Sequence, residues 1–125
     1  MKSLRGYIHS RKFMGERCPQ HVQNLVLRDY CQKYNYKYML SGAEYAMEGS
    51  YIILNQVISE IPNIDGVVFY SLFQLPKKQK ERKEIYRKIL QKSGEIHFAL
   101  EGLKITRECE VTKIENIWMI HLKML

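Results

Sequence analysis

The sequence contains few cysteines, glycines and prolines, and each shortage excludes a class of protein. Its three cysteines, Cys18, Cys31 and Cys109, are widely spaced and form no CxxC pair, so neither a structural zinc site nor a disulfide framework is expected. Only 7 glycines and 3 prolines occur in 125 residues, which excludes collagen-like chains and linker arrays. We expect three free thiols in a reducing compartment.

The sequence also lacks a long hydrophobic run. No apolar stretch approaches the roughly 18 residues that a transmembrane helix needs. The N-terminal segment is polar again by Arg5 and has no signal-peptide core. We therefore expect a soluble, cytoplasmic protein without a membrane partner. A length of 125 residues is near the commonest domain size, which predicts one domain over residues 1–125.

Most of the net charge of +7 lies in one segment of the chain. Residues 77–92 hold eight basic residues against Glu81 and Glu84, a local balance of +6, and the rest of the chain is nearly neutral. Such a basic stretch is a candidate for nucleic-acid binding. Opposite charges at helical spacing along it also suit an ordinary solvated helix face, which we favour, so nucleic acid is not the expected partner.

Short apolar runs alternate with amphipathic stretches, which predicts alternating strands and helices. The predicted strands are 4–9, 36–41, 66–71 and 96–100. The predicted helices are 19–34, 50–61, 77–92 and a C-terminal one from about residue 108, although 118–124 also alternates as a strand would. In the first helix the steps of three and four predict a buried face of Val22, Leu25, Val26, Tyr30, Cys31 and Tyr34.

The order of these elements predicts an α/β fold in three layers, with a mainly parallel sheet and helices on both faces. The first and third strands should lie side by side at the centre, and residues 67–69 should be almost completely buried. The C-terminal helix carries a stripe of Val111, Ile114 and Trp118. This stripe must be covered by the sheet or by another subunit, and we expect a homo-oligomer.

Polar residues follow each predicted strand, and ligands bind beyond the carboxyl ends of the strands in such sheets. Cations before a helix N-terminus favour an anion, and carboxylates or an imidazole there can transfer protons. The candidate catalytic residues are Ser10, Glu16, His21 and Glu44. The candidate substrate-binding residues are Arg11, Arg17, Gln20, Tyr45, Ser71 and Gln74. A plain structural role stays open for each, since loop residues are polar in any case.

No cofactor or metal motif accompanies these candidates. Neither GxGxxG nor GxxxxGK[ST] occurs, so no cofactor is predicted. His9, His97 and His121 have no spacing that suggests a metal site. Cys18 lies before Pro19 near a predicted helix N-terminus, where the pKa of a thiol falls. Because the sequence places no base beside Cys18, a nucleophilic role is the less favoured interpretation.

Three segments carry a resemblance to a known family: GYIHS at 6–10, LRDYC at 27–31 and IDGVVFYSL at 64–72. Over about residues 4–101 the chain is similar to the catalytic domain of the serine recombinases, the resolvases and invertases. The resemblance implies a resolvase-like architecture related to the flavodoxin-like folds. It also implies a serine after the first strand, a position that Ser10 could fill with the spacing off by about one residue.

The same family has the signature Leu-Asp-Arg-Leu-x-Arg after its third strand. In residues 72–77, Phe73 stands in place of the aspartate, and Gln74 and Lys77 stand in place of the two arginines. These changes remove most of the electrostatic help that a phosphoryl transfer needs. The resemblance therefore implies the resolvase-like fold without active recombinase chemistry.

A second resemblance rests on RGYI at 5–8, FMGER at 13–17, PQHVQN at 19–24, EYAM at 44–47 and YSLFQLP at 70–76. These segments are similar to a family of small bacterial proteins, with no established reaction, encoded sporadically within carbohydrate-biosynthesis clusters. The resemblance implies surface-glycan synthesis. We expect a protein that binds, and could transform, an anionic sugar, sugar phosphate or nucleotide sugar. The alternative is a catalytically degenerate resolvase-like domain that acts as a DNA-binding or protein-interaction module.

Overall fold

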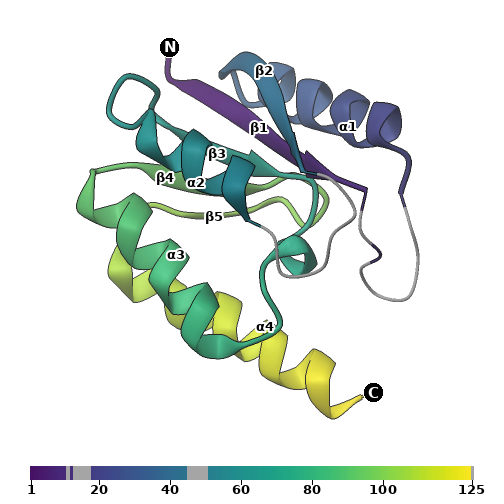
Figure 1. Ribbon diagram of the computed structural model, residues 1–125, viewed down its shortest axis with the longest axis vertical. Coiled ribbons are helices and arrows are strands. Elements are labelled where there is room, and N and C mark those ends of the chain that lie inside the picture. The colour runs from purple at the N-terminus through teal and green to yellow at the C-terminus, as the bar shows by residue number, and fades with distance from the viewer. Residues whose placement is uncertain (11, 13–17, 45–50, 125) are drawn as a thin grey trace.

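The computed structural model describes residues 1–10, 12, 18–44 and 51–124. Its strands and helices, in chain order, are β1 (Ser3–His9), α1 (Gln20–Lys33), β2 (Lys37–Glu44), α2 (Ile52–Ser59), β3 (Gly66–Phe69), α3 (Gln79–Gln91), β4 (Glu95–Phe98), β5 (Leu103–Ile105) and α4 (Val111–Lys123) (Figure 1). Two short 3-10 helices, η1 (Leu72–Gln74) and η2 (Glu108–Glu110), follow β3 and β5. Every predicted strand and helix is present, and the tail is a helix.

The strands form one sheet in the order β2-β1-β3-β4-β5. β1 is parallel to both β2 and β3, and β4 is parallel to β3. The predicted α/β fold with a mainly parallel sheet is confirmed, as is the central pairing of the first and third strands. The connection that leaves β1 leads to β2 on one side of the sheet centre, and the connection that leaves β3 leads to β4 on the other side.

The antiparallel strand β5 is an element that the sequence does not predict. Only three residues, Leu103–Ile105, pair with β4, which is too short a run for alternation to show. A tight turn leads into it, in which Gly102 has a φ of +67°. Such a left-handed conformation is easy only for glycine, so this residue permits the hairpin.

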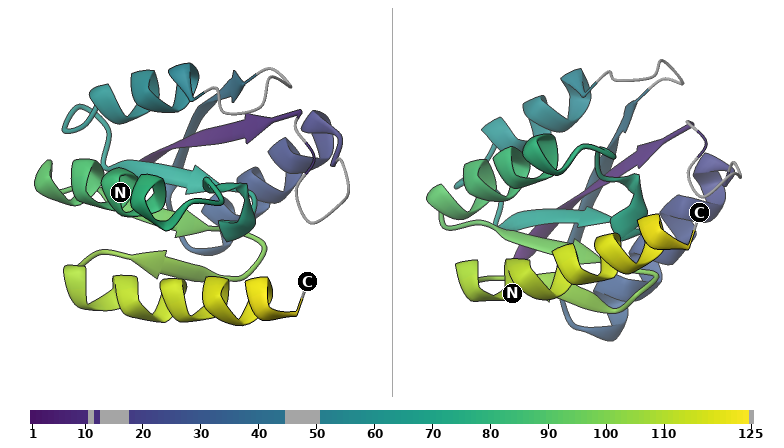
Figure 2. Two further views of the ribbon diagram at one scale, coloured as in Figure 1. Left: turned by 60° about the horizontal axis from the view of Figure 1, so that its bottom comes forward. Right: turned by 90° about the horizontal axis from the view of Figure 1, so that it is seen from below.

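Helices cover both faces of the sheet (Figure 2). α2, α3 and α4 pack on the face that carries Phe69 and Phe98, and α1 packs on the opposite face against Leu4 and Val68. Residues 67–69 have no exposed surface, as predicted. Their side chains alternate between the two cores, which is why this strand is a continuous apolar run.

α1 is rotated away from the face that its apolar residues predict. Its buried side chains are Gln23, Leu27, Tyr30 and Cys31. Leu25 is 64% exposed, so the predicted face is wrong at this position and also at the exposed Tyr34. The rotation places a polar glutamine inside the protein, where its amide makes hydrogen bonds described below.

α4 closes the larger core. Its stripe of Val111, Ile114 and Trp118 is buried in the same cluster as α2, α3 and the sheet. The stripe is therefore covered within the chain, and it gives no reason to expect a partner subunit. No helix within the described residues is long and apolar enough to cross a membrane.

A buried ion pair joins α3 to α4. The guanidinium of Arg82, only 3% exposed, donates to both carboxylate oxygens of Glu115 at 2.9 Å. It also lies 4.3 Å from the ring centroid of Trp118, and Tyr86 donates to the same carboxylate at 2.7 Å. The basic segment is thus not wholly a solvated face, because one of its cations belongs to the interior.

Candidate functional site

The centre of the sheet has a change in connection direction at the carboxyl ends of β1 and β3. From β1 the chain passes to β2 on one side, whereas β3 lies on the other side of β1. In α/β sheets such a switch point opens a crevice beyond the strand ends, and this crevice is the usual ligand site. The loops after β1, β2 and β3 carry most of the residues that the sequence singled out.

Two buried glutamines, Gln23 of α1 and Gln74 of η1, join the loops after β1 and β3. The amide nitrogen of Gln23 donates to the carbonyl oxygens of His9 and Cys18 at 2.8 Å each. The amide nitrogen of Gln74 donates to the side-chain oxygen of Gln23 at 2.8 Å. The backbone N–H of Tyr70 donates to the side-chain oxygen of Gln74 at 3.0 Å. The two ends of the first loop are therefore held together and tied to the end of β3.

The sequence analysis predicted a ligand-binding role for Gln74 and overlooked Gln23. Gln74 is buried, and both ends of its amide are bonded within the protein. A signal for Gln23 was present, because it stands at helical spacing from Leu27, Tyr30 and Cys31. A lone polar residue in line with a buried stripe indicates an internal hydrogen-bond partner.

Glu44, at the end of β2, connects the sheet to the start of α2. Its carboxylate accepts hydrogen bonds from the hydroxyl of Tyr7 at 3.2 Å and from the backbone N–H groups of Ile53 at 3.0 Å and Leu54 at 3.2 Å. Carboxylates are favoured at helix N-termini, where the N–H groups lack partners in the helix. The structure thus places this candidate catalytic residue, which is 3% exposed, in the role of an anchor for α2.

Ser71 is also buried, directly after β3. Its hydroxyl donates to the carboxylate of Glu101 at 2.7 Å and accepts from the N–H of Phe73 at 3.1 Å. Glu101, from the loop after β4, accepts a second bond from the N–H of Leu72 at 3.0 Å. These bonds join the loop after β3 to the loop after β4. The two glutamines join the loop after β1 to the loop after β3 in the same way.

The remaining described candidates lie around the start of α1. Ser10 follows β1 and is half-buried, Gln20 begins α1 and is half-buried, and His21 is exposed in its first turn. α1 has no side-chain cap and no acidic residue in its first turn. The N–H groups of Val22 and Gln23 donate to the carbonyl oxygen of Pro19 at 3.1 Å each, and the positive end of the helix dipole favours an anion at this end. Four candidates, Arg11, Glu16, Arg17 and Tyr45, lie outside the described residues.

The cysteines differ in their surroundings. All three are free thiols, as predicted. Burial raises the pKa of Cys31 to about 11, which keeps this thiol protonated and unreactive. Burial and a hydrogen bond with Cys18 raise the pKa of Tyr70, which keeps the Tyr70 hydroxyl protonated where the loops after β1 and β3 meet.

A second group of titratable side chains lies away from this edge, on the face that α1 covers. The hydroxyl of Tyr30 is 2.7 Å from Nδ1 of His97, and Nε2 of His97 is 2.8 Å from a carboxylate oxygen of Glu95. Lys2 forms an ion pair with the other carboxylate oxygen. Because a carboxylate only accepts, Nε2 carries the proton and Nδ1 accepts from Tyr30.

Burial lowers the pKa of His97 in spite of the neighbouring carboxylate. Burial alone would raise the pKa of Glu95, but the hydrogen bonds from Lys2 and His97 outweigh it and lower that pKa. The histidine is therefore neutral and the glutamate charged. This group ties α1 to β4, and none of the predicted site residues belongs to it. Among the described residues, no group of three or more histidine, cysteine or acidic side chains is placed to hold a metal ion.

No family model matches the sequence, and no curated protein matches it either. Among solved structures, a resolvase family site-specific recombinase from Streptococcus pneumoniae is similar with a TM-score of 0.67 and 10% identity, over 96% of this chain and 89% of the other. The N-terminal catalytic domain of TP901-1 integrase is similar with a TM-score of 0.65 and 14% identity, over 96% and 95%. The chain has a resolvase-like fold. At these identities the likeness concerns the fold alone.

The resolvase-like fold confirms the architecture that the first resemblance implied. At the three signature positions, Phe73 packs on Trp118 with 5.2 Å between ring centroids, Gln74 is buried in the glutamine bridge, and Lys77 is exposed. Of these three side chains Lys77 alone is charged, and it lies on the surface. The side chains of Phe73 and Gln74 instead make contacts inside the protein.

Proposed function

We propose that the protein binds an anionic sugar, sugar phosphate or nucleotide sugar at the carboxyl edge of its sheet, in bacterial surface-glycan synthesis. The observation that carries this proposal is the switch point between β1 and β3. The switch point favours a ligand beyond the strand ends. The N-terminus of α1, which follows the loop after β1 and has no side-chain cap, favours a ligand with negative charge. The glycan context comes from the second resemblance.

The described residues divide into a framework and a binding surface. Glu44, Ser71 and Gln74 are buried and bonded internally, so they hold the loops in position. Ser10, Gln20 and His21 are accessible around the start of α1, where they can orient hydroxyl groups or move a proton. In this proposal the guanidinium groups of Arg11 and Arg17 bind the anion, and Glu16 and Tyr45 complete the surface.

The proposal is tested by titrating the isotope-labelled protein with glucose 1-phosphate, UDP-glucose and neutral glucose while following the backbone amide signals of Gln20 and His21. We expect saturable shifts with the two phosphorylated ligands only. An Arg17→Ala variant should bind about 10- to 100-fold more weakly, the scale of a lost hydrogen bond to a charged group. A Lys113→Ala variant, which removes an exposed cation on α4, is the matched control. Shifts that avoid α1, or equal weakening by both variants, would contradict the proposal.

A second candidate is a catalytically degenerate resolvase-like module that binds DNA or another protein. The similarity to catalytic domains titled as a site-specific recombinase and an integrase favours it, together with the basic α3. Fluorescence anisotropy with a short DNA duplex separates the two candidates. Tight duplex binding that weakens steeply with salt would favour the module, whereas duplex binding no tighter than nonspecific contact would favour the sugar ligand.

A further inference from the structure

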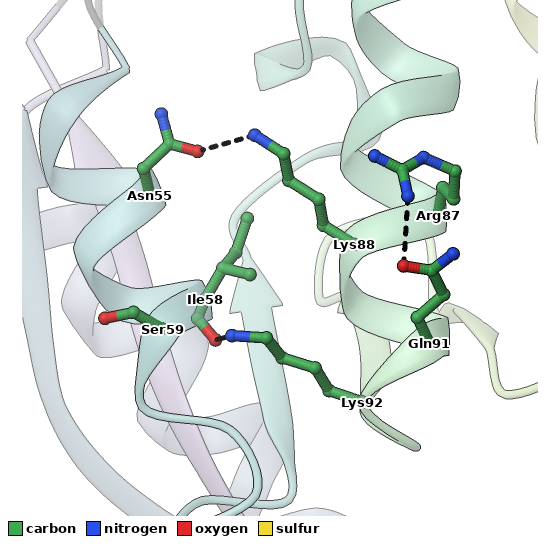
Figure 3. A pocket seen from close by; sticks show the side chains of 7 residues that line it. All are labelled: Asn55, Ile58, Ser59, Arg87, Lys88, Gln91 and Lys92. Atoms are coloured by element: carbon green, nitrogen blue, oxygen red, sulfur yellow. Dashed lines mark hydrogen bonds between the residues drawn. The ribbon is translucent and has the colours of Figure 1, made fainter.

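A hollow of about 350 Å³ opens between α2 and α3 (Figure 3). Its lining side chains are Asn55, Ile58 and Ser59 from α2 and Arg87, Lys88, Gln91 and Lys92 from α3. Three of these side chains carry a positive charge, and none carries a negative one. The hollow reaches the C-terminal ends of both helices, from which the chain turns into β3 and β4. It therefore lies toward the amino edge of the sheet, away from the switch point.

Two lysines cross the opening from α3 toward α2 (Figure 3). The Nζ atom of Lys88 lies 3.5 Å from the side-chain oxygen of Asn55, and the Nζ atom of Lys92 lies 3.4 Å from the carbonyl oxygen of Ile58. Both contacts are long for hydrogen bonds, and each uses one of the three donors of an ammonium group. Each lysine thus retains donors for a further acceptor in the hollow.

The positive charges in the hollow are not balanced by its own walls. Lys88 and Lys92 stand four residues apart on one helix, a spacing at which like charges destabilise the helix. Glu84 pairs with Arg87 on the exposed surface of α3, with a second contact of 3.1 Å. An anion between the two lysines would remove their repulsion.

We propose that this hollow binds the phosphate group of a small phosphorylated ligand. Lysine ammonium groups bind phosphate as point charges. The amide nitrogen of Asn55 donates to the carbonyl oxygen of Tyr51 at 2.9 Å, and the hydroxyl of Ser59 donates to the carbonyl oxygen of Gln56 at 2.6 Å. The side-chain oxygen of Gln91 accepts from Arg87 at 3.0 Å, which leaves its amide nitrogen and the second hydrogen of the Asn55 amide for the rest of the ligand. The volume is that of a small-molecule site. The concave shape between two helices favours such a ligand over a nucleic-acid backbone, and the site stands independently of the function proposed above.

The test follows the side-chain amide signals of Asn55 and Gln91 in the labelled full chain during titration with pyrophosphate and with glucose 1-phosphate. We expect saturable shifts of both signals. A Lys88→Ala, Lys92→Ala double variant should lose at least about tenfold in affinity, since two charged contacts are removed. A Lys80→Ala, Lys83→Ala variant removes the same charge from exposed positions on α3 outside the hollow and should keep its affinity within about twofold.

A short DNA duplex is titrated as well, because a nucleic-acid backbone is the other source of phosphate groups. Equal weakening of every titrant by both double variants would overturn the proposal, because it would assign binding to the overall charge of α3. The absence of saturable shifts at Asn55 and Gln91 in the unmodified protein would overturn it as well. An Asn55→Asp variant adds a carboxylate opposite Lys88 and should weaken phosphate binding, and unchanged affinity there would also contradict the site.

Discussion

At the scale of single residues, the polar side chains at the strand ends divide by burial rather than by chemical type. Glu44, Ser71 and Gln74 are each at most 3% exposed, and each is hydrogen-bonded inside the protein. Glu44 accepts from N–H groups at the start of α2, Ser71 donates to Glu101, and Gln74 donates to Gln23. A buried polar group without a partner costs free energy, so these side chains are held in place by the groups that they satisfy. The residues left for a ligand are the accessible ones around α1.

The glutamine bridge provides a first expectation. A Gln23→Ala variant leaves the carbonyl groups of His9 and Cys18 and the amide of Gln74 without their partner. Because each buried unsatisfied group costs about 1–3 kcal/mol and three groups lose this partner, we expect the free energy of unfolding to fall by at least about 3 kcal/mol. Urea denaturation measures it. A Gln32→Ala variant at an exposed position of the same helix should change stability by less than about 0.5 kcal/mol, and equal losses in the two variants would show that the bridge is not stabilising.

The neutral His97 gives a pH-dependent expectation. Its pKa in the folded protein lies below the value of about 6.5 in the unfolded chain, so the unfolded state binds more protons between these two values. The contribution of His97 to stability is therefore complete above about pH 6.5 and decreases as the pH falls toward the folded pKa.

Unfolding free energies measured from pH 8 to pH 5 test the sign. A His97→Gln variant should be less stable at pH 8 but should lose less further stability on acidification than the unmodified protein. Glu95 acts in a separate window, because its lowered pKa affects stability only as the pH falls below the ordinary carboxyl range. Parallel pH curves for the two proteins would show that His97 does not titrate as expected.

At the scale of elements, α3 has two chemically different sides. One side carries Ile85, Tyr86 and Ile89 into the core and places Arg82 against α4. The other side carries the exposed lysines and the wall of the hollow. The high positive charge of the segment thus serves an internal ion pair, a solvated surface and a candidate phosphate site at different helical positions.

The ion pair between Arg82 and Glu115 should be a principal link between α3 and α4. A Glu115→Ala variant leaves a buried guanidinium without its partner, which costs about 3–5 kcal/mol. Thermal and urea unfolding measure this loss. The exposed pair of Glu84 and Arg87 is the control, since solvent screens this pair and Glu84→Ala should change stability far less than Glu115→Ala. Arg82 also donates to the carbonyl oxygens of Pro76 at 3.1 Å and Lys77 at 2.6 Å, and a small loss for Glu115→Ala would mean that these two groups already compensate its charge.

At the scale of the whole molecule, the sheet is covered unequally. α2, α3 and α4 shield one face, and α1 lies on the other (Figure 2), where Tyr30 and Tyr36 pack around His97. The apolar stripe of α4 faces inward, whereas Met119, Ile120 and Leu122 are exposed on the same helix. The outward side of α4 is thus both apolar and exposed.

Assembly into a homo-oligomer stays a prediction. It now rests on the exposed apolar side chains of α4, because the stripe of Val111, Ile114 and Trp118 is covered within the chain. Light scattering at micromolar concentration should give a multiple of the chain mass. An Ile120→Glu variant should give the monomer mass, because a charge in an apolar interface is costly. A Lys113→Glu variant on the same helix serves as the control. A monomer in the unmodified protein would contradict the prediction.

The sequence by itself determined the order of the helices and of the four parallel strands, whereas the short antiparallel β5 was not predictable from it. The continuous apolar run at residues 66–69 follows from burial on both faces, and the alternation of apolar runs with amphipathic helices specifies a parallel sheet. The burial of apolar side chains is decided within each element, and it is therefore visible directly in the periodicity of the sequence. The resolvase-like fold was accordingly predictable from pattern and resemblance together.

Only the tertiary structure decided what the polar residues do. Gln23 pairs with Gln74 across 51 positions of sequence, and this contact turns α1 away from the face that its apolar spacing favours. Glu44 caps α2 and Ser71 bonds to Glu101 for the same kind of reason. The role of a buried polar side chain depends on its hydrogen-bond partners. These partners are brought together by the packing of helices on the sheet, and such long-range contacts leave no periodic signal in the sequence.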